Sequence, residues 1–156
     1  MTSIWLKCLL KMLMLKKSSY NGAIENSQYA DFTGTFGGAY INCGNFIFPS
    51  GAESWAGFAN LNTDLYPFDF SNGGQITFDA KLITSNVNIK FRFEKNPYPD
   101  IVDPSFETEA IKINENKTYT ITILKRPSNE RYSSFILYLI DRDIEINITN
   151  VKVEIN

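Results

Sequence analysis

The residues in this sequence that are best suited to chemistry are aromatic rings that lie beside small and polar residues. Trp55 closely follows Glu53 in the stretch "ESWAGFANLN", and Tyr98 lies between two prolines. A flat ring with hydrogen-bonding groups beside it fits a sugar ring, which presents apolar C–H faces and a rim of hydroxyls. Packing into the protein core is the alternative for each ring, and equally for Tyr66 and Tyr132, which also lie near Gly, Pro, Ser or Asn.

A second group of candidate residues lies on strands that we expect to be neighbours. The segment "NVNIKFRFEK" alternates apolar and polar residues, so Arg92 and Glu94 face away from the side chains that enter the core. Outward residues of adjacent strands share one face, where Arg92 and Glu94 could meet Tyr138. Arginine donates in a planar fork, carboxylates accept hydrogen bonds, and rings stack. The predicted ligand-binding residues are Glu53, Trp55, Arg92, Glu94, Tyr98 and Tyr138.

The composition argues against an enzyme. The chain holds no histidine, which removes the commonest general base and every Ser-His or Cys-His nucleophile pair. Its acidic residues do not form the E-x-D-x-x-E spacing of family 16 glycoside hydrolases. Enzymes that cleave glycosidic bonds need two carboxylates that flank the bond. We therefore predict no catalytic residues.

Charge and metal-ligand patterns limit the partners. A net formal charge of -2, with no stripe of Lys and Arg in the folded part, provides no electrostatic footprint for nucleic acid.

Asp100, Asp103 and Glu107 lie in one loop and supply the hard oxygen ligands that calcium prefers. A solvated acidic loop gives the same pattern. We predict no metal-ligating residues and no required cofactor, and leave a structural calcium ion open.

The first residues differ from the rest of the chain. In "MTSIWLKCLLKMLMLKK", Lys7 and Lys11 divide the apolar run, so the segment fits neither a signal peptide nor a membrane span of about 20 residues. We predict that residues 1–26 form a leader and connector outside the core and that residues 27–156 form the folded module. A short interfacial helix near the N-terminus is the alternative. Because Cys8 lies in this leader, we expect Cys43 to be a lone thiol, a small buried hydrophobe.

Short strands account for the rest of the chain. Residues 73–83, 117–124 and 143–155 alternate apolar and polar side chains, and turn residues separate these runs. Residues 133–141, "SSFILYLID", are apolar on both faces, which is typical of a central strand covered on both sides. No sustained helical periodicity follows residue 26, so the pattern predicts an all-β, antiparallel β-sandwich or jelly roll. Residues 94–107 form a long proline-rich connection, a common place for binding sites.

Three stretches carry a family resemblance: residues 36–80, "FGGAYINCGNFIFPSGAESWAGFANLNTDLYPFDFSNGGQITFDA", residues 87–104, "VNIKFRFEKNPYPDIVDP", and residues 133–155, "SSFILYLIDRDIEINITNVKVEI". Together they resemble carbohydrate-binding-type β-sandwich modules appended to secreted polysaccharide-degrading enzymes of marine bacteria, including laminarinase-like ones. The closing "NITNVKVEI" is similar to the last strand of galactose-binding-like jelly rolls. Those often carry Asp-Asp-Val there and help to hold a structural calcium, whereas this chain has Thr149, Asn150 and Val151.

This resemblance implies a function and a location. The chain is expected to be a non-catalytic, extracellular carbohydrate-binding module that recognises a polysaccharide, with a β-glucan favoured. It is also expected to be attached to, or derived from, a larger secreted protein, with no nucleic acid partner and no membrane span. The rival reading is a structural or adhesive β-sandwich, such as a surface-protein or virion decoration domain, in which the same rings only pack.

Overall fold

The computed structural model describes residues 6–9 and 28–156. Residues 6–9 are helical, and a short 3-10 helix η1 spans Thr63–Leu65. The strands of the described part are β1 (Gly34–Phe36), β2 (Tyr40–Asn42), β3 (Asn45–Ile47), β4 (Gly57–Ala59), β5 (Gly74–Leu82), β6 (Val87–Glu94), β7 (Ser105–Glu107), β8 (Ile111–Ile113), β9 (Lys117–Ile123), β10 (Ser134–Leu139) and β11 (Glu145–Ile155).

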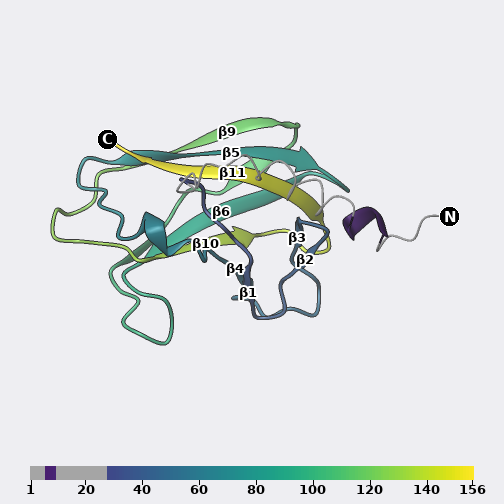
Figure 1. The fold of residues 1–156 in the computed structure, drawn as a ribbon, viewed down its shortest axis with the longest axis horizontal. Coiled ribbons are helices and arrows are strands. Elements are labelled where there is room, and N and C mark those ends of the chain that lie inside the picture. The colour runs from purple at the N-terminus through teal and green to yellow at the C-terminus, as the bar shows by residue number, and fades with distance from the viewer. Residues whose placement is uncertain (1–5, 10–27) are drawn as a thin grey trace.

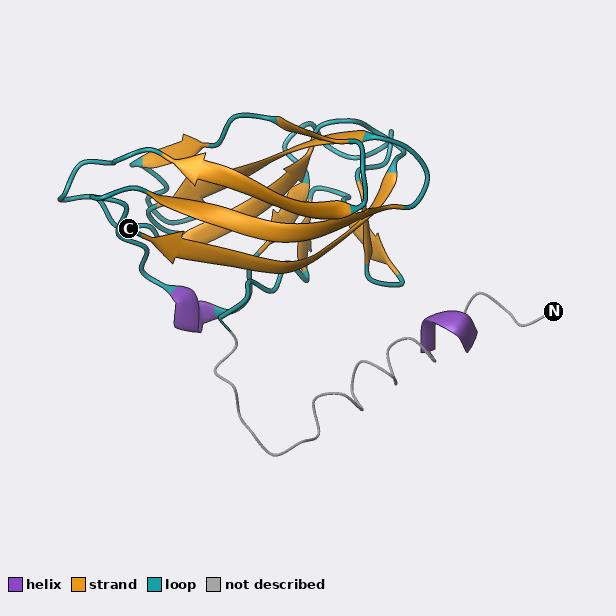
Figure 2. Ribbon diagram, turned by 90° about the horizontal axis from the view of Figure 1, so that it is seen from above, coloured by secondary structure: helices purple, strands orange, loops and turns teal. Residues whose placement is uncertain are grey.

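These strands form two antiparallel sheets that lie as layers (Figures 1 and 2). The first, called the β10 sheet after its central strand, has the order β1-β4-β10-β6-β7, and β8 also pairs with β6. The second, the β11 sheet, has the order β2-β3-β11-β5-β9. From β3 to β6 and again from β8 to β11, each connection crosses from one sheet to the other. The predicted fold class, an all-β antiparallel sandwich, is confirmed.

The core lies between the two sheets and is rich in phenylalanine. On β6 the alternate residues Ile89, Phe91 and Phe93 are fully buried, as period two predicts. Phe93 stacks on Phe135 of β10 with ring centroids 4.4 Å apart. On β5 of the other sheet, Phe78 is buried as well and meets Phe91 edge to face. The inward rings of the two sheets therefore pack against each other and form the core. The outward residues of β6 and β10 are not needed for this packing.

The connection after β6 is shorter than the sequence suggests. Residues 94–107 were expected to be one long loop, but their end forms β7, which pairs with β6 so that Arg92 faces Glu107. The backbone N–H of Lys95 donates to the carbonyls of Val102 and Pro104, which closes the loop of residues 95–104. A three-residue strand is too short to show a period in sequence.

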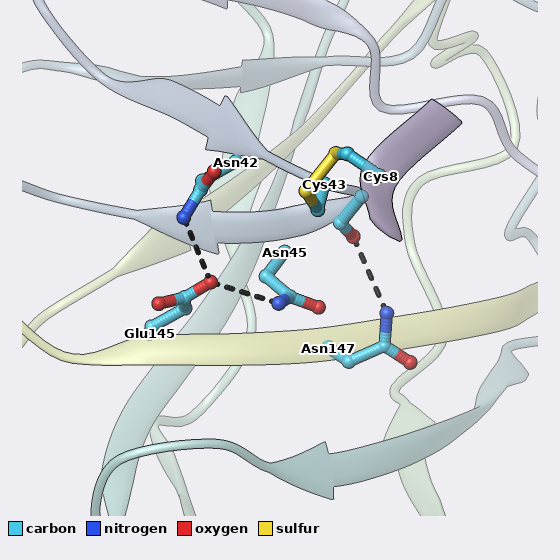
Figure 3. Close-up of a disulfide and its surroundings, with 7 residues drawn as sticks. Cys8, Asn42, Cys43, Asn45, Glu145 and Asn147 are labelled. Carbon is cyan, nitrogen blue, oxygen red and sulfur yellow. Dashed lines mark hydrogen bonds between the residues drawn. A yellow bond between two sulfur atoms is a disulfide. The ribbon is translucent and has the colours of Figure 1, made fainter. Parts of the chain in front are cut away.

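The two cysteines form a disulfide, so the expectation that Cys43 is a lone thiol is wrong. Figure 3 shows the bond between Cys8, in the helical residues 6–9, and Cys43, in the turn between β2 and β3. The turn is anchored to β11, since the side chain of Asn147 donates to the carbonyl of Gly44 at 3.3 Å. Cysteine spacing alone could not show that the two residues meet in space. The remainder of the predicted leader and connector lies outside the described residues.

No helix in the described ranges has the length and apolar content needed to cross a membrane.

Candidate functional site

A groove lies on the outer face of the β10 sheet. Its larger part, which we call the apolar lobe, has a volume of about 570 Å³. This lobe is lined by Phe36, Trp55, Ala59, Glu94, Pro97, Tyr98, Ser134, Ile136 and Tyr138. A smaller part of about 310 Å³, the charged lobe, shares Trp55 and Tyr138 with it and continues past Lys90, Glu107 and Ile140. The lobes therefore meet at Trp55 and Tyr138 and follow the direction of β10.

Strand register explains why these side chains share one face. Residues directly opposite each other in an antiparallel pair point to the same side of the sheet. Ser134 of β10 pairs with Glu94 of β6, and Tyr138 pairs with Lys90. Because Phe135, Leu137 and Leu139 point into the core, Ser134, Ile136 and Tyr138 point out. The sequence predicted that β10 is apolar on both faces because other parts of the protein cover both. In the structure, its outer face instead forms the floor of the groove.

Gly57 lets the rings approach one another. A Cβ atom there would lie 2.8 Å from Tyr138 Cε1 and 2.9 Å from Phe36 Cζ, closer than atoms can pack. With no side chain in the way, Phe36 meets Tyr138 edge to face at 6.2 Å between centroids. The indole of Trp55 lies parallel to Phe36, at 6.3 Å and 7°. Trp55 nevertheless remains 58% exposed, so one of its faces is available to a ligand.

A clamp holds the loop that leads to Trp55. The Nη1 group of Arg142 donates to the carbonyl oxygens of Pro49, Ser50 and Ala52, at 2.8, 3.1 and 2.9 Å. These contacts hold the turn a few residues before Trp55 against the connection between β10 and β11. Nη1 carries two N–H groups, so one of them is shared between two carbonyls, and the guanidinium carbon lies 4.0 Å from the centroid of the Phe48 ring.

The residue next to Arg142 completes the clamp. The carboxylate of Asp143 accepts hydrogen bonds from the backbone N–H of Ser50, at 2.9 Å, and from the Ser50 hydroxyl. These two hydrogen bonds lower the pKa of Asp143, the hydroxyl contributing most. The backbone N–H of Asp143 donates in turn to the carbonyl of Phe48. Arg142 and Asp143 together therefore fix the first part of the loop, from Phe48 to Ala52.

Glu94 lines the apolar lobe while being only 7% exposed. Its Oε1 accepts from Nε of Arg92 at 2.7 Å, and its Oε2 accepts from the hydroxyl of Ser134 at 3.2 Å. Arg92 also donates through Nη2 to Ser105 at 3.0 Å, and its Nη1 lies 3.6 Å from a carboxylate oxygen of Glu107. Partial burial alone would lower the pKa of Arg92, but the hydrogen bond to Glu94 and the charges of Glu94 and Glu107 raise it.

An ion pair borders the charged lobe. Lys90 Nζ lies 2.6 Å from Oε2 of Glu107 and 5.9 Å from the centroid of the Tyr138 ring. Burial raises the pKa of Tyr138, and the negative charge of Glu94 adds to this effect. The phenol therefore stays neutral and keeps its proton to donate at ordinary pH.

Four of the six predicted binding residues line the apolar lobe: Glu94, Trp55, Tyr98 and Tyr138. Arg92 lies beside them and binds Glu94 rather than lining the lobe. Glu53 is exposed and lies in the turn before Trp55, where its backbone N–H donates to the carbonyl of Gly37.

Other lining residues escaped the sequence reasoning. Ser134 and Ile136 lie four and two residues before Tyr138, so period two could have identified them. Phe36 and Pro97 carry no such signal, because only the folded arrangement brings them to the groove. Of the remaining loop aromatics, Tyr132 is fully buried and Tyr66 is partly buried in the core.

Two of the three acidic residues considered for calcium, Asp103 and Glu107, have other partners. Asp103 accepts a hydrogen bond from Ser105 at 2.8 Å, and Glu107 pairs with Lys90. In the last strand, Asn150 has a φ of 53° at a bulge and donates to Asp79 at 2.9 Å. Within the part of the chain that the structure describes, His, Cys, Asp and Glu form no group of three that could hold a metal ion.

The fold is similar to that of a solved carbohydrate-binding domain. The CBM22-1 xylan-binding domain from Paenibacillus barcinonensis Xyn10C superposes with a TM-score of 0.52, over 81% of this chain and 90% of that one, at 16% sequence identity. At this identity the likeness shows a shared β-sandwich fold. No family model and no curated protein sequence matches the chain.

Proposed function

We propose that this chain is a non-catalytic carbohydrate-binding module that holds a polysaccharide in the groove of the β10 sheet. One observation carries the proposal: Trp55 and Tyr98 are 58% and 87% exposed in the same lobe as the buried carboxylate of Glu94. Rings held open to solvent beside a hydrogen-bond acceptor fit the apolar face and hydroxyl rim of a sugar.

The rings supply stacking surfaces that need little rearrangement. Trp55 is supported from behind by Phe36, and its loop is fixed by Arg142. A surface that is already ordered loses little conformational entropy on binding, so more of the contact free energy appears as affinity. Tyr98 is more exposed and comes from the loop of residues 95–104, at the other side of the lobe.

Glu94 supplies the polar contacts. A carboxylate has about four acceptor positions, and Arg92 and Ser134 use two of those on Glu94. The others can accept sugar hydroxyls, and hydrogen bonds to a charged acceptor are stronger than neutral ones. Arg92 then acts chiefly by holding Glu94 in place, rather than by donating to the sugar as its position in the sequence suggested.

We propose that no bond is cleaved. A glycosidase needs a general acid that carries a proton at neutral pH. Glu94 and Glu107 are the acidic groove residues, and both pair with cations, Arg92 and Lys90. Reducing-sugar release from xylan or β-glucan should therefore stay at the level without protein. Turnover that disappears on changing Glu94 to Gln would overturn this part of the proposal.

The family resemblance and the structural neighbour point to two different polysaccharides as the ligand. The family resemblance favours a β-glucan, while the structural neighbour is described as xylan-binding. We propose a β-glucan as the first ligand and xylan as the second.

The Cys8–Cys43 disulfide supports an oxidising, extracellular setting, and we place residues 27–156 as the module of a larger secreted protein. Residues 1–26 would then form a leader and connector outside its core.

Isothermal titration with oligomers of β-1,3-glucan and of xylan tests the proposal. We expect saturable binding of at least one oligomer, abolished or strongly weakened by Trp55→Ala. Tyr40→Ala is the matched control, because Tyr40 is an exposed aromatic on the β11 sheet. Absence of binding to every glycan tested would favour the structural or adhesive sandwich instead.

A further inference from the structure

We infer, building on the proposed function, that the groove selects uncharged polysaccharides and excludes those that carry carboxylate or sulfate groups. The inference rests on how the four charged residues of the outer face of β6 and β7 pair with one another: Lys90, Arg92, Glu94 and Glu107.

These residues form a continuous chain of ion pairs. Lys90 binds Glu107 at 2.6 Å, Arg92 lies 3.6 Å from the other oxygen of Glu107, and Arg92 binds Glu94 at 2.7 Å. Two cations and two anions therefore neutralise each other on the protein itself. All three guanidinium nitrogens of Arg92 already face protein oxygens. Nε binds Glu94, Nη1 lies near Glu107, and Nη2 donates to the Ser105 hydroxyl.

The apolar lobe presents an acidic side chain and, among its lining residues, no basic one. That residue is Glu94, and its partner Arg92 does not line the lobe. A carboxylate or sulfate on the ligand would lie beside the Glu94 carboxylate and find no cation among the lining residues to pair with. An anion that gives up water without gaining a cationic partner, next to a like charge, should bind about tenfold or more weakly.

Among the residues that the structure describes, the charged lobe offers no free cation to compensate. Its ammonium group, that of Lys90, is held by Glu107 and lies near the face of Tyr138. An anionic sugar would have to displace Glu107 from Lys90 to gain an attractive contact. A neutral sugar can instead share hydrogen bonds with both residues without breaking the pair.

Matched polymers test the selection. The probes are hydroxyethyl and carboxymethyl derivatives of one β-glucan, prepared with equal degrees of substitution, and affinity electrophoresis reports the dissociation constants. We expect the carboxymethyl polymer to bind about tenfold or more weakly. Equal affinity for both overturns this inference and leaves the proposed function standing, whereas binding of neither overturns both.

A charge-unmasking variant sharpens the test. Glu107→Gln removes the partner of Lys90, so the charged lobe gains a free cation, and the preference for the hydroxyethyl polymer should shrink several-fold. The gain should fade as salt is raised, because salt screens exposed charges. Glu115→Gln is the control, since Glu115 pairs with Lys117 of β9 in the other sheet. An unchanged preference in Glu107→Gln, with thermal unfolding intact, would contradict the role of the ion-pair chain.

Discussion

The outer faces of the two sheets differ in what they do with polar groups. On the β11 sheet, polar residues pair locally at the surface: Lys152 binds Glu154 at 2.8 Å, and Thr118 donates to Asp79 at 2.5 Å. On the β10 sheet, a carboxylate is drawn almost completely out of solvent at Glu94, in a lobe walled by exposed rings. A folded sandwich needs nothing like the second arrangement, since the first already gives a soluble face. The contrast is the physical reason for assigning a ligand to the β10 sheet.

The largest expected effect comes from removing the buried carboxylate. Glu94→Ala leaves Arg92 without its main partner, and breaking a buried pair costs about 3 kcal/mol of unfolding free energy. Urea unfolding followed by circular dichroism measures it. The matched change on the β11 sheet, Glu154→Ala, should leave the unfolding midpoint almost unchanged because that carboxylate is exposed. Equal losses of unfolding free energy in the two variants would show that Glu94 is no more important to stability than a surface carboxylate of the β11 sheet.

Removing the exposed ring should act on binding rather than on folding. Trp55→Ala deletes a large stacking surface, and we expect about thirtyfold lower affinity for the bound oligomer, or about 2 kcal/mol. Its thermal midpoint should fall little, since the indole is more than half exposed. A variant that unfolds much more easily but binds normally would show that Trp55 serves the fold.

A smaller effect is expected from the clamp. Arg142→Ala frees the carbonyls of Pro49, Ser50 and Ala52, so the loop before Trp55 must be ordered on binding, and affinity should fall about fivefold. Calorimetry should show the loss as a less favourable entropy. Arg142→Lys should not fully restore binding, because the shorter lysine lacks the planar guanidinium that lies over the Phe48 ring at 4.0 Å. Arg131→Ala, which removes the contact to Asp69, is the control.

The smallest effect concerns the phenol of Tyr138. Its pKa is raised in the folded state, chiefly by burial, so its contribution to stability is complete below the ordinary phenol pKa of about 10. The contribution is lost as the pH rises from there through the raised folded value. Tyr138→Phe should therefore flatten part of the fall in stability above pH 10 and change little at pH 7. Unfolding midpoints of the parent protein and of Tyr138→Phe, measured between pH 8 and about 11, test this. Equal dependence of the two midpoints on pH would mean that the phenol is as well solvated in the folded state as in the unfolded state.

The sequence predicted this contrast only in part. Period two along β6 placed Arg92 and Glu94 on one outer face, because alternation is a local property of the strand, and the expected adjacency of strands brought Tyr138 to them. It could not show the order of strands, which brings Phe36 of β1 to Tyr138 of β10. Nor could it show that Arg92 has its donors occupied, because hydrogen-bond partners such as Ser105 come from a strand too short to recognise.

Nuclear magnetic resonance tests the central claim most directly, by titrating the labelled protein with the glycan oligomer that binds best. If the groove holds the glycan, chemical shifts should change at the indole of Trp55, at Tyr98 and along Ser134 to Ile140. Those of Thr118, Thr120 and Lys152 of the β11 sheet should stay unchanged. Shift changes centred on the β11 sheet, with the groove residues unaffected, would contradict the claim.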